Sequence, residues 1–139
     1  MTDSPPAFFG PPVTLHVCVT CRPPDGPEAE ADRPGSQLFR ALEARLAQAE
    51  TPLPIRLEPA RCLSVCKRPC TVAVSSPGRW SYIYGDLDPA ASLDALLDGI
   101  SRYAATSDGI VPWRERPQEF RKGVVARIPP LNSFPEAAE

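Results

Sequence analysis

The sequence is poor in the features that mark membrane, nucleic-acid-binding and secreted proteins. No apolar run approaches the roughly 18–20 residues that a bilayer span needs, so no transmembrane helix is predicted. Lysine and arginine number 15 against 17 acidic residues, a net charge of −2, which argues against the strongly basic face of a nucleic-acid-binding domain. The N-terminus lacks the basic region and apolar stretch of a secretory signal. We therefore expect a soluble cytoplasmic protein with no nucleic-acid or membrane partner.

The motifs of common enzyme classes are also missing. There is one histidine, His16, and the sequence shows no Ser/His/Asp set, no paired-carboxylate motif and no glycine-rich phosphate loop. These absences disfavour a hydrolase or a kinase, and they favour a non-catalytic electron-transfer or metal-binding protein. No internal repeat is visible, and 139 residues fit one domain.

Hydrophobic periodicity predicts a short α/β domain. Most of the nineteen prolines lie in the first 34 or the last 30 residues, which predicts a flexible tail over 1–12, a folded domain over 13–106 and a C-terminal extension over 107–139. The predicted elements are a strand from Val13 to Thr20, a helix from Pro34 to Glu50 that Asp32 or Ser36 would cap, a strand from Ile55 to Glu58, a hairpin of 71–75 and 80–84, a helix opened by Asp88, and a last short strand from Gly123 to Ile128. The order β-α-β then β-β-α is that of a thioredoxin-like sandwich, with the first two strands parallel.

Five cysteines in two tight groups are the chemically distinctive feature of the sequence. The first group, Cys18-x2-Cys21, ends the first predicted strand, and the second, Cys62-x3-Cys66-x3-Cys70, follows the second strand. Because the first two strands are expected to be parallel, both groups should lie at the same end of the sheet. Thiolates bind zinc and iron–sulfur clusters, and four of them suit either. The sequence therefore predicts a metal or cluster site made from these residues.

Zinc binding and dithiol redox chemistry are the alternatives. Two short cysteine hooks are typical of structural zinc, so the spacing leaves zinc and iron–sulfur open. A thioredoxin-type dithiol places its first cysteine at a helix N-terminus, which stabilises the thiolate. Here Cys18 and Cys21 are followed by Arg22-Pro23-Pro24 and a long loop, so dithiol catalysis is disfavoured. His16 shares the strand face of Cys18, but a lone histidine on a strand is more often a packed or surface residue than a ligand.

The second half of the chain contains Cys62-x3-Cys66, the run Thr71-Val72-Ala73-Val74, the turn Pro77-Gly78-Arg79 and the aromatic residues Trp80 and Tyr82. In this order of features it resembles the thioredoxin-like 2Fe–2S ferredoxins. It implies a 2Fe–2S cluster, an electron carrier or accessory redox protein, and Cys21 in the place of the family's first ligand. That family has its other first-half ligand in the loop before the first helix, where residues 25–36 contain no cysteine. Cys18 or Cys70 must then supply the fourth ligand.

A longer stretch is similar to a small bacterial family of unknown function whose members are described as predicted metal-binding proteins. The similarity runs from about residue 13 to 130 and includes the cysteine pattern. Members are often encoded beside genes for aerobic cobalamin synthesis, which implies a role near cobalt insertion or corrin-ring redox chemistry. The partner would be a redox protein or a cobalamin-pathway enzyme. The alternative is a zinc- or cobalt-binding module for metal delivery or scaffolding, and the oligomeric state stays open, a homodimer included.

Basic residues recur in two places that bear on partners. They flank both cysteine groups, at Arg22, Arg61, Lys67 and Arg68. These cations suit the docking of an acidic redox partner, or they are ordinary solvated charges. Aromatic and basic residues also mix over 113–117 and 121–122. This segment either clasps a partner or wraps its own domain, and we favour wrapping.

Overall fold

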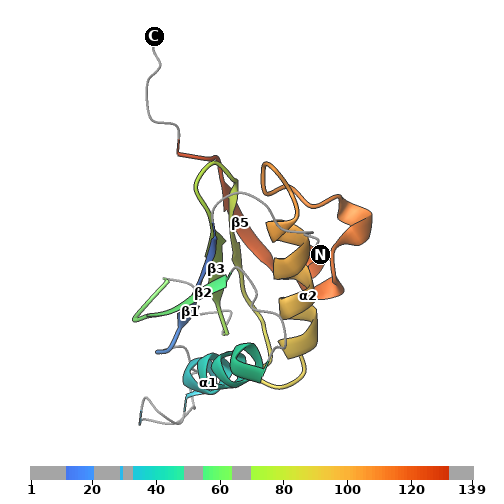
Figure 1. Ribbon diagram of the computed structural model, residues 1–139. Coiled ribbons are helices and arrows are strands. Elements are labelled where there is room, and N and C mark those ends of the chain that lie inside the picture. The colour runs from blue at the N-terminus through green and yellow to red at the C-terminus, as the bar shows by residue number, and fades with distance from the viewer. Residues whose placement is uncertain (1–11, 21–28, 30–32, 49–54, 64–69, 132–139) are drawn as a thin grey trace, which may run out of the picture.

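The chain folds into a five-stranded mixed sheet with two long helices (Figure 1). The computed structural model describes residues 12–20, 29, 33–48, 55–63 and 70–131. The elements that form the sheet and its main helices are β1 (Val13–Cys18), α1 (Pro34–Gln48), β2 (Ile55–Ala60), β3 (Val72–Ser75), β4 (Ser81–Tyr84), α2 (Leu93–Ala104) and β5 (Val124–Ile128). The sheet order is β2-β1-β3-β4-β5; β1 and β2 are parallel and the other neighbours are antiparallel. The predicted order β-α-β then β-β-α is confirmed.

The core lies between one face of the sheet and both long helices. Val13, Leu15 and Val17 alternate along β1 and are each 0 % exposed. They belong to the same apolar cluster as residues of α1 and α2, chiefly Leu38, Leu42, Leu96, Ile100 and Tyr103. Thr14 and His16 point to the other face of the strand and are only partly buried. Both helices therefore cover one face of the sheet.

The first helix begins as predicted, but Ser36 does not cap it. Proline is favoured in the first helical turn, and α1 starts at Pro34. Ser36 lies inside the helix, and its hydroxyl donates to the Val19 carbonyl at 3.0 Å instead of capping. Asp32 lies outside the described residues. In the described part of the chain no helix combines the length and the apolar character that crossing a bilayer requires.

The second helix begins later than the sequence predicts. The pattern places its start at Asp88, whereas α2 begins at Leu93. The Asp88 carboxylate accepts hydrogen bonds from the amides of Ala90 and Ala91, at 2.9 and 2.6 Å. These two bonds lower the pKa of Asp88. The aspartate thus caps a turn that leads into the helix, because its side-chain acceptor satisfies local amides equally well there.

Residues 107–131 add two short helical elements and the last strand to this core. A 3-10 turn, η2 (Trp113–Glu115), and a short helix, α3 (Gln118–Lys122), precede β5. Phe120 of α3 is 2 % exposed, and its ring stacks on Tyr84 with centroids 3.9 Å apart. Gly99 of α2 makes room for it, since a Cβ there would overlap the Phe120 ring. Strand β5 confirms the short strand predicted over 123–128.

Candidate metal centre

The sheet topology brings the three described cysteines to one end of the sheet. Cys18 is the last residue of β1 and pairs in register with Ala60, the last residue of β2. Cys62 follows Ala60 by two residues, and the Cys18 amide donates to the Thr71 carbonyl at 3.0 Å, next to Cys70. The parallel pairing expected from the sequence thus produces this arrangement. Cys21 and Cys66 lie outside the described residues.

A polar contact ties the end of β1 to the segment that carries Cys62. The Cys18 thiol lies 3.5 Å from the Thr20 hydroxyl. That hydroxyl in turn donates to the carbonyl of Arg61, the residue before Cys62. The two cysteine-bearing segments are therefore linked through one side chain. Cys18 is 3 % exposed and Cys62 is exposed, so the linked pair runs from the interior to the surface.

Cys70 occupies a different environment from the other two. It is 1 % exposed and belongs to the apolar core cluster. Its backbone forms a two-way pair with Leu87, at 3.0 and 3.1 Å. Burial, together with the negative charges of Asp88 and Cys18, raises the pKa of the Cys70 thiol to about 12. The interior therefore disfavours the thiolate form of Cys70, and Cys18 lies close enough that a negative charge on it would disfavour that form further.

The N-terminus of α1 packs against the end of β1, which the sequence did not reveal. Gly35 permits this approach, since a Cβ at that position would overlap the Cys18 carbonyl oxygen. Ser36 binds the Val19 carbonyl, and the Arg33 guanidinium donates to the Thr20 carbonyl at 3.3 Å. A helix N-terminus carries partial positive charge, and arginine adds a full one. The cysteine end of the sheet is therefore electropositive on the α1 side.

A family comparison identifies what kind of chain this is. Residues 15–130 match the family described as "Protein of unknown function (DUF1636)". The chain belongs to this family. The match spans most of the chain and includes all five cysteines, which confirms the similarity to a family of unknown function. No curated protein matched the chain significantly.

Solved structures show what fold this family member shares. A thioredoxin-like [2Fe-2S] ferredoxin from Aquifex aeolicus matches with a TM-score of 0.56 and 21 % identity, over 90 % of this chain and 100 % of the ferredoxin chain. A 1.5 Å structure of the wild-type ferredoxin matches with a TM-score of 0.54 and 21 % identity, over 84 % and 99 %. A cysteine-to-serine variant of it matches at 0.52 and 19 %, over 82 % and 98 %. The thioredoxin-like fold predicted from the element order is confirmed.

The assignment of the metal ligands stays a prediction, because Cys21 and Cys66 lie outside the described residues. Within 12–20, 33–48, 55–63 and 70–131, no group of three histidine, cysteine, aspartate or glutamate side chains is arranged to hold a metal ion. His16 lies two residues before Cys18, between Glu58 and Ala73 in the sheet register. It stays a weaker candidate.

Proposed function

We propose that the protein binds a 2Fe–2S cluster through Cys18, Cys21, Cys62 and Cys66 and works as a one-electron carrier. Four cysteine thiolates are the usual donor set of such a cluster. When bound, the cluster supplies reversible one-electron chemistry, and the protein sets its potential through charge, hydrogen bonds and solvent access. The likeness in fold to thioredoxin-like [2Fe-2S] ferredoxins supports this choice.

The contrast between Cys18 and Cys70 carries the assignment of the fourth ligand. Cys18 ends a strand beside the strand that leads to Cys62, and Thr20 links the two segments. Cys70 sits in the apolar core, and its backbone is fixed by Leu87. A ligand must give up its proton and face the other ligands. The position of Cys18 favours this, and that of Cys70 does not.

The surroundings of Cys18 fit a negatively charged centre. A cluster with four thiolate ligands bears net negative charge, which nearby cations and helix N-termini stabilise. Arg33 and the first turn of α1 provide both at the end of β1. Cys62 is exposed, so an electron would have a short route to a docked partner. The partner would be a redox protein or an enzyme of cobalamin synthesis, because members of the family that the chain resembles are often encoded beside genes for that pathway.

Metal analysis of cysteine variants tests the proposal. The protein is purified without oxygen, and its visible spectrum and its iron and zinc contents are measured. We expect a brown protein with about two irons per chain that bleaches with dithionite. Cys18→Ser and Cys62→Ser should lose the iron. Cys70→Ser is the matched control, because it makes the same change at an equally buried site and should keep the iron.

Two results would contradict the proposal in different ways. A colourless protein with about one zinc per chain would favour the zinc module, for which the Cys18-x2-Cys21 hook is typical. Iron lost in Cys70→Ser but kept in Cys18→Ser would overturn the ligand assignment and leave the cluster in place. Circular dichroism of each variant separates loss of the cluster from loss of the fold.

A further inference from the structure

The Thr20 hydroxyl lies between the segments that carry two of the proposed ligands. It is 3.5 Å from the Cys18 sulfur, and it donates a hydrogen bond to the carbonyl of Arg61, which precedes Cys62. A hydroxyl has one proton to donate and two lone pairs that accept. Because that proton is directed to the Arg61 carbonyl, the Cys18 thiol is the donor in its own contact with Thr20. The three groups form a hydrogen-bonded chain from Cys18 through Thr20 to Arg61.

The backbone around Thr20 is held in place from two sides. The Val19 amide donates to the Ala60 carbonyl at 2.9 Å, which ties it to the end of β2. The Ser36 hydroxyl donates to the Val19 carbonyl at 3.0 Å, and the Arg33 guanidinium donates to the Thr20 carbonyl at 3.3 Å. The fold therefore positions the Thr20 hydroxyl in advance, and redirecting its proton needs only a rotation about one bond.

Metal binding removes the first donor of this hydrogen-bonded chain. A cysteine binds a metal ion or a cluster as the thiolate, so the Cys18 proton leaves. A Thr20 hydroxyl that kept its orientation would then direct an oxygen lone pair at a negatively charged sulfur, which is repulsive. Its proton should turn to that sulfur, because a hydrogen bond to a charged acceptor is stronger than one to a neutral carbonyl. Arg61 is exposed, so water can replace Thr20 at its carbonyl.

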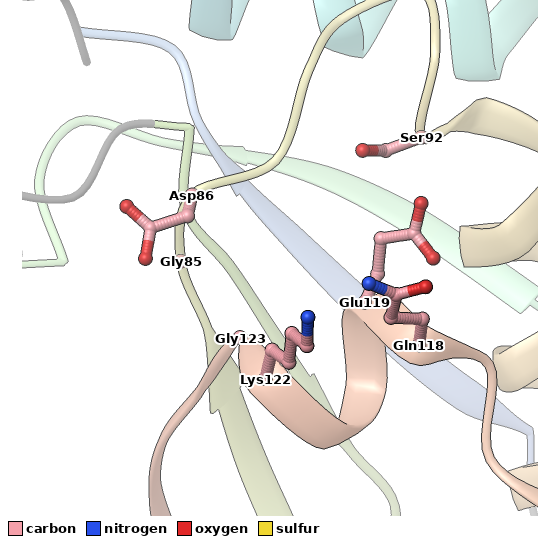
Figure 2. Close-up of a pocket in the computed structure, with 7 residues that line it drawn as sticks. All are labelled: Gly85, Asp86, Ser92, Gln118, Glu119, Lys122 and Gly123. Atoms are coloured by element: carbon pink, nitrogen blue, oxygen red, sulfur yellow. The ribbon is translucent and has the colours of Figure 1, made fainter.

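Charged side chains on the α3 side of the cysteine end offset one another in part. A cavity of about 310 Å³ is lined there by Asp86, which directly precedes Leu87, the backbone partner of Cys70. Figure 2 shows the Lys122 ammonium directed into the space between the carboxylates of Asp86 and Glu119. One cation beside two carboxylates leaves a small net charge, and solvent screens it. A hydrogen bond made directly to a ligand sulfur should therefore affect a bound cluster more than these charges do.

We infer that Thr20 is a positioning residue for the proposed cluster, and that its hydroxyl donates to the Cys18 sulfur once Cys18 is a ligand. This inference rests on the proposed function and adds a residue that is not itself a ligand. Hydrogen bonds to the sulfurs of a cluster help to set its reduction potential. The bond favours the reduced form, because that form carries one more negative charge and its sulfurs are stronger acceptors. Thr20 should thus raise the potential.

Reduction potentials of single variants of the intact protein test this role. Thr20→Val removes the hydroxyl and keeps the size of the side chain, whereas Thr20→Ser keeps the hydroxyl. We expect Thr20→Val to favour the oxidised form by about three- to tenfold, which lowers the potential by about 30–60 mV. Thr20→Ser should restore the potential of the wild type. Thr14→Val is the matched control, because it makes the same change near the other end of β1 and should leave the potential unchanged.

Resonance Raman spectra add a readout that a merely structural role of Thr20 would not move. A hydroxyl bonded to a ligand sulfur exchanges its proton in heavy water, so the iron–sulfur stretching bands of the wild type should shift on that transfer. The shift should be smaller in Thr20→Val and retained in Thr20→Ser. Circular dichroism checks the fold of each variant, and Thr20→Ala replaces Thr20→Val in both measurements if the valine variant does not fold.

The outcomes separate this inference from the cluster proposal. An unchanged potential and an unchanged heavy-water shift in Thr20→Val, with iron retained, would overturn the role of Thr20 and leave the cluster in place. An equal fall of the potential in Thr20→Val and Thr20→Ser would assign the effect to packing and overturn the hydrogen bond. A wild-type protein without iron would overturn both proposals.

Discussion

Arg79 is a buried cation whose removal should unfold the protein more readily than any surface arginine. Its side chain is 3 % exposed. The guanidinium donates from Nε to the Thr106 carbonyl and from Nη2 to the Ala104 carbonyl, both at 3.1 Å, and from Nη1 to the Ser76 hydroxyl at 2.9 Å. Ala104 is the last residue of α2, so the arginine satisfies carbonyls that the helix leaves without an internal partner. A positive charge there also suits the helix dipole.

These contacts set the size of the effect. A hydrogen bond from a charged group contributes at least about 1.5 kcal/mol, so three of them contribute at least about 4.5 kcal/mol. Part of this is offset, because Arg79→Met also removes the penalty of burying a charge. We therefore expect Arg79→Met to lower the free energy of unfolding by about 2–4 kcal/mol. Arg79→Lys keeps the charge but loses the fork of donors, so its loss should be smaller.

Urea unfolding followed by circular dichroism measures the change. The matched control is Arg102→Met on α2, where the arginine side chain is 45 % exposed and pairs with Asp98 at 3.0 Å. An exposed i,i+4 pair contributes about 0.3–0.5 kcal/mol, so this variant should lose little. If Arg79→Met unfolds within about 0.5 kcal/mol of the wild type, the three hydrogen bonds do not stabilise the fold as argued here.

Four further substitutions have contrasting expected effects. Tyr103→Phe should lower the free energy of unfolding by about 1 kcal/mol, because the Tyr103 hydroxyl donates to the Trp80 carbonyl. Tyr82→Phe should leave the free energy of unfolding equal or higher, since in the described part of the chain the buried Tyr82 hydroxyl has no hydrogen-bond partner. Parallel urea unfolding curves compare the two variants. Gly99→Ala should cost about 1–3 kcal/mol in the same assay, since the added methyl overlaps the Phe120 ring; an unchanged midpoint would contradict this packing. In metal-free protein the pKa of the Cys70 thiol is raised from 9.0 to about 12 in the folded state, so the unfolded chain loses this proton at a lower pH than the folded protein does. The free energy of unfolding should therefore fall as the pH rises from 9 to 12. The fall should be less steep in Cys70→Ala than in the wild type.

Local sequence signals predicted the sheet well because its strands carry their own patterns. The alternation in β1 and the Pro77-Gly78 turn need only neighbouring residues to be read, and Gly78 adopts the positive φ of 78° that such a turn favours. α3 has five residues, too few to show helical periodicity, so it was not predicted. The predicted start of α2 was wrong because an aspartate accepts backbone hydrogen bonds in the same way in a turn as at a helix N-terminus, and Asp88 does so in a turn.

The candidate site was predictable only as far as strand topology determines it. Parallel pairing was enough to place Cys18 near Cys62, since register follows from the strands. The two cysteines differ in their surroundings, because the backbone of Cys70 pairs with that of Leu87, a residue 17 positions further along the chain. The approach of α1 depends on the missing side chain of Gly35, which carries no signal of its own in one sequence. Contacts of this kind exist only once the chain has folded.

The two ends of the sheet therefore have separable roles. The three described cysteines and Gly35 lie at the end where β1 finishes, whereas Arg79 lies in the turn at the opposite end, just before β4. Interactions that share no partner contribute to stability independently. Arg79→Met should then lower stability without changing the iron content per folded chain, whereas Gly35→Ala should disturb both, because the helix would be pushed away from Cys18. Equal iron loss in the two variants would mean that the proposed cluster responds to overall stability, and not to the local packing that we describe around Cys18.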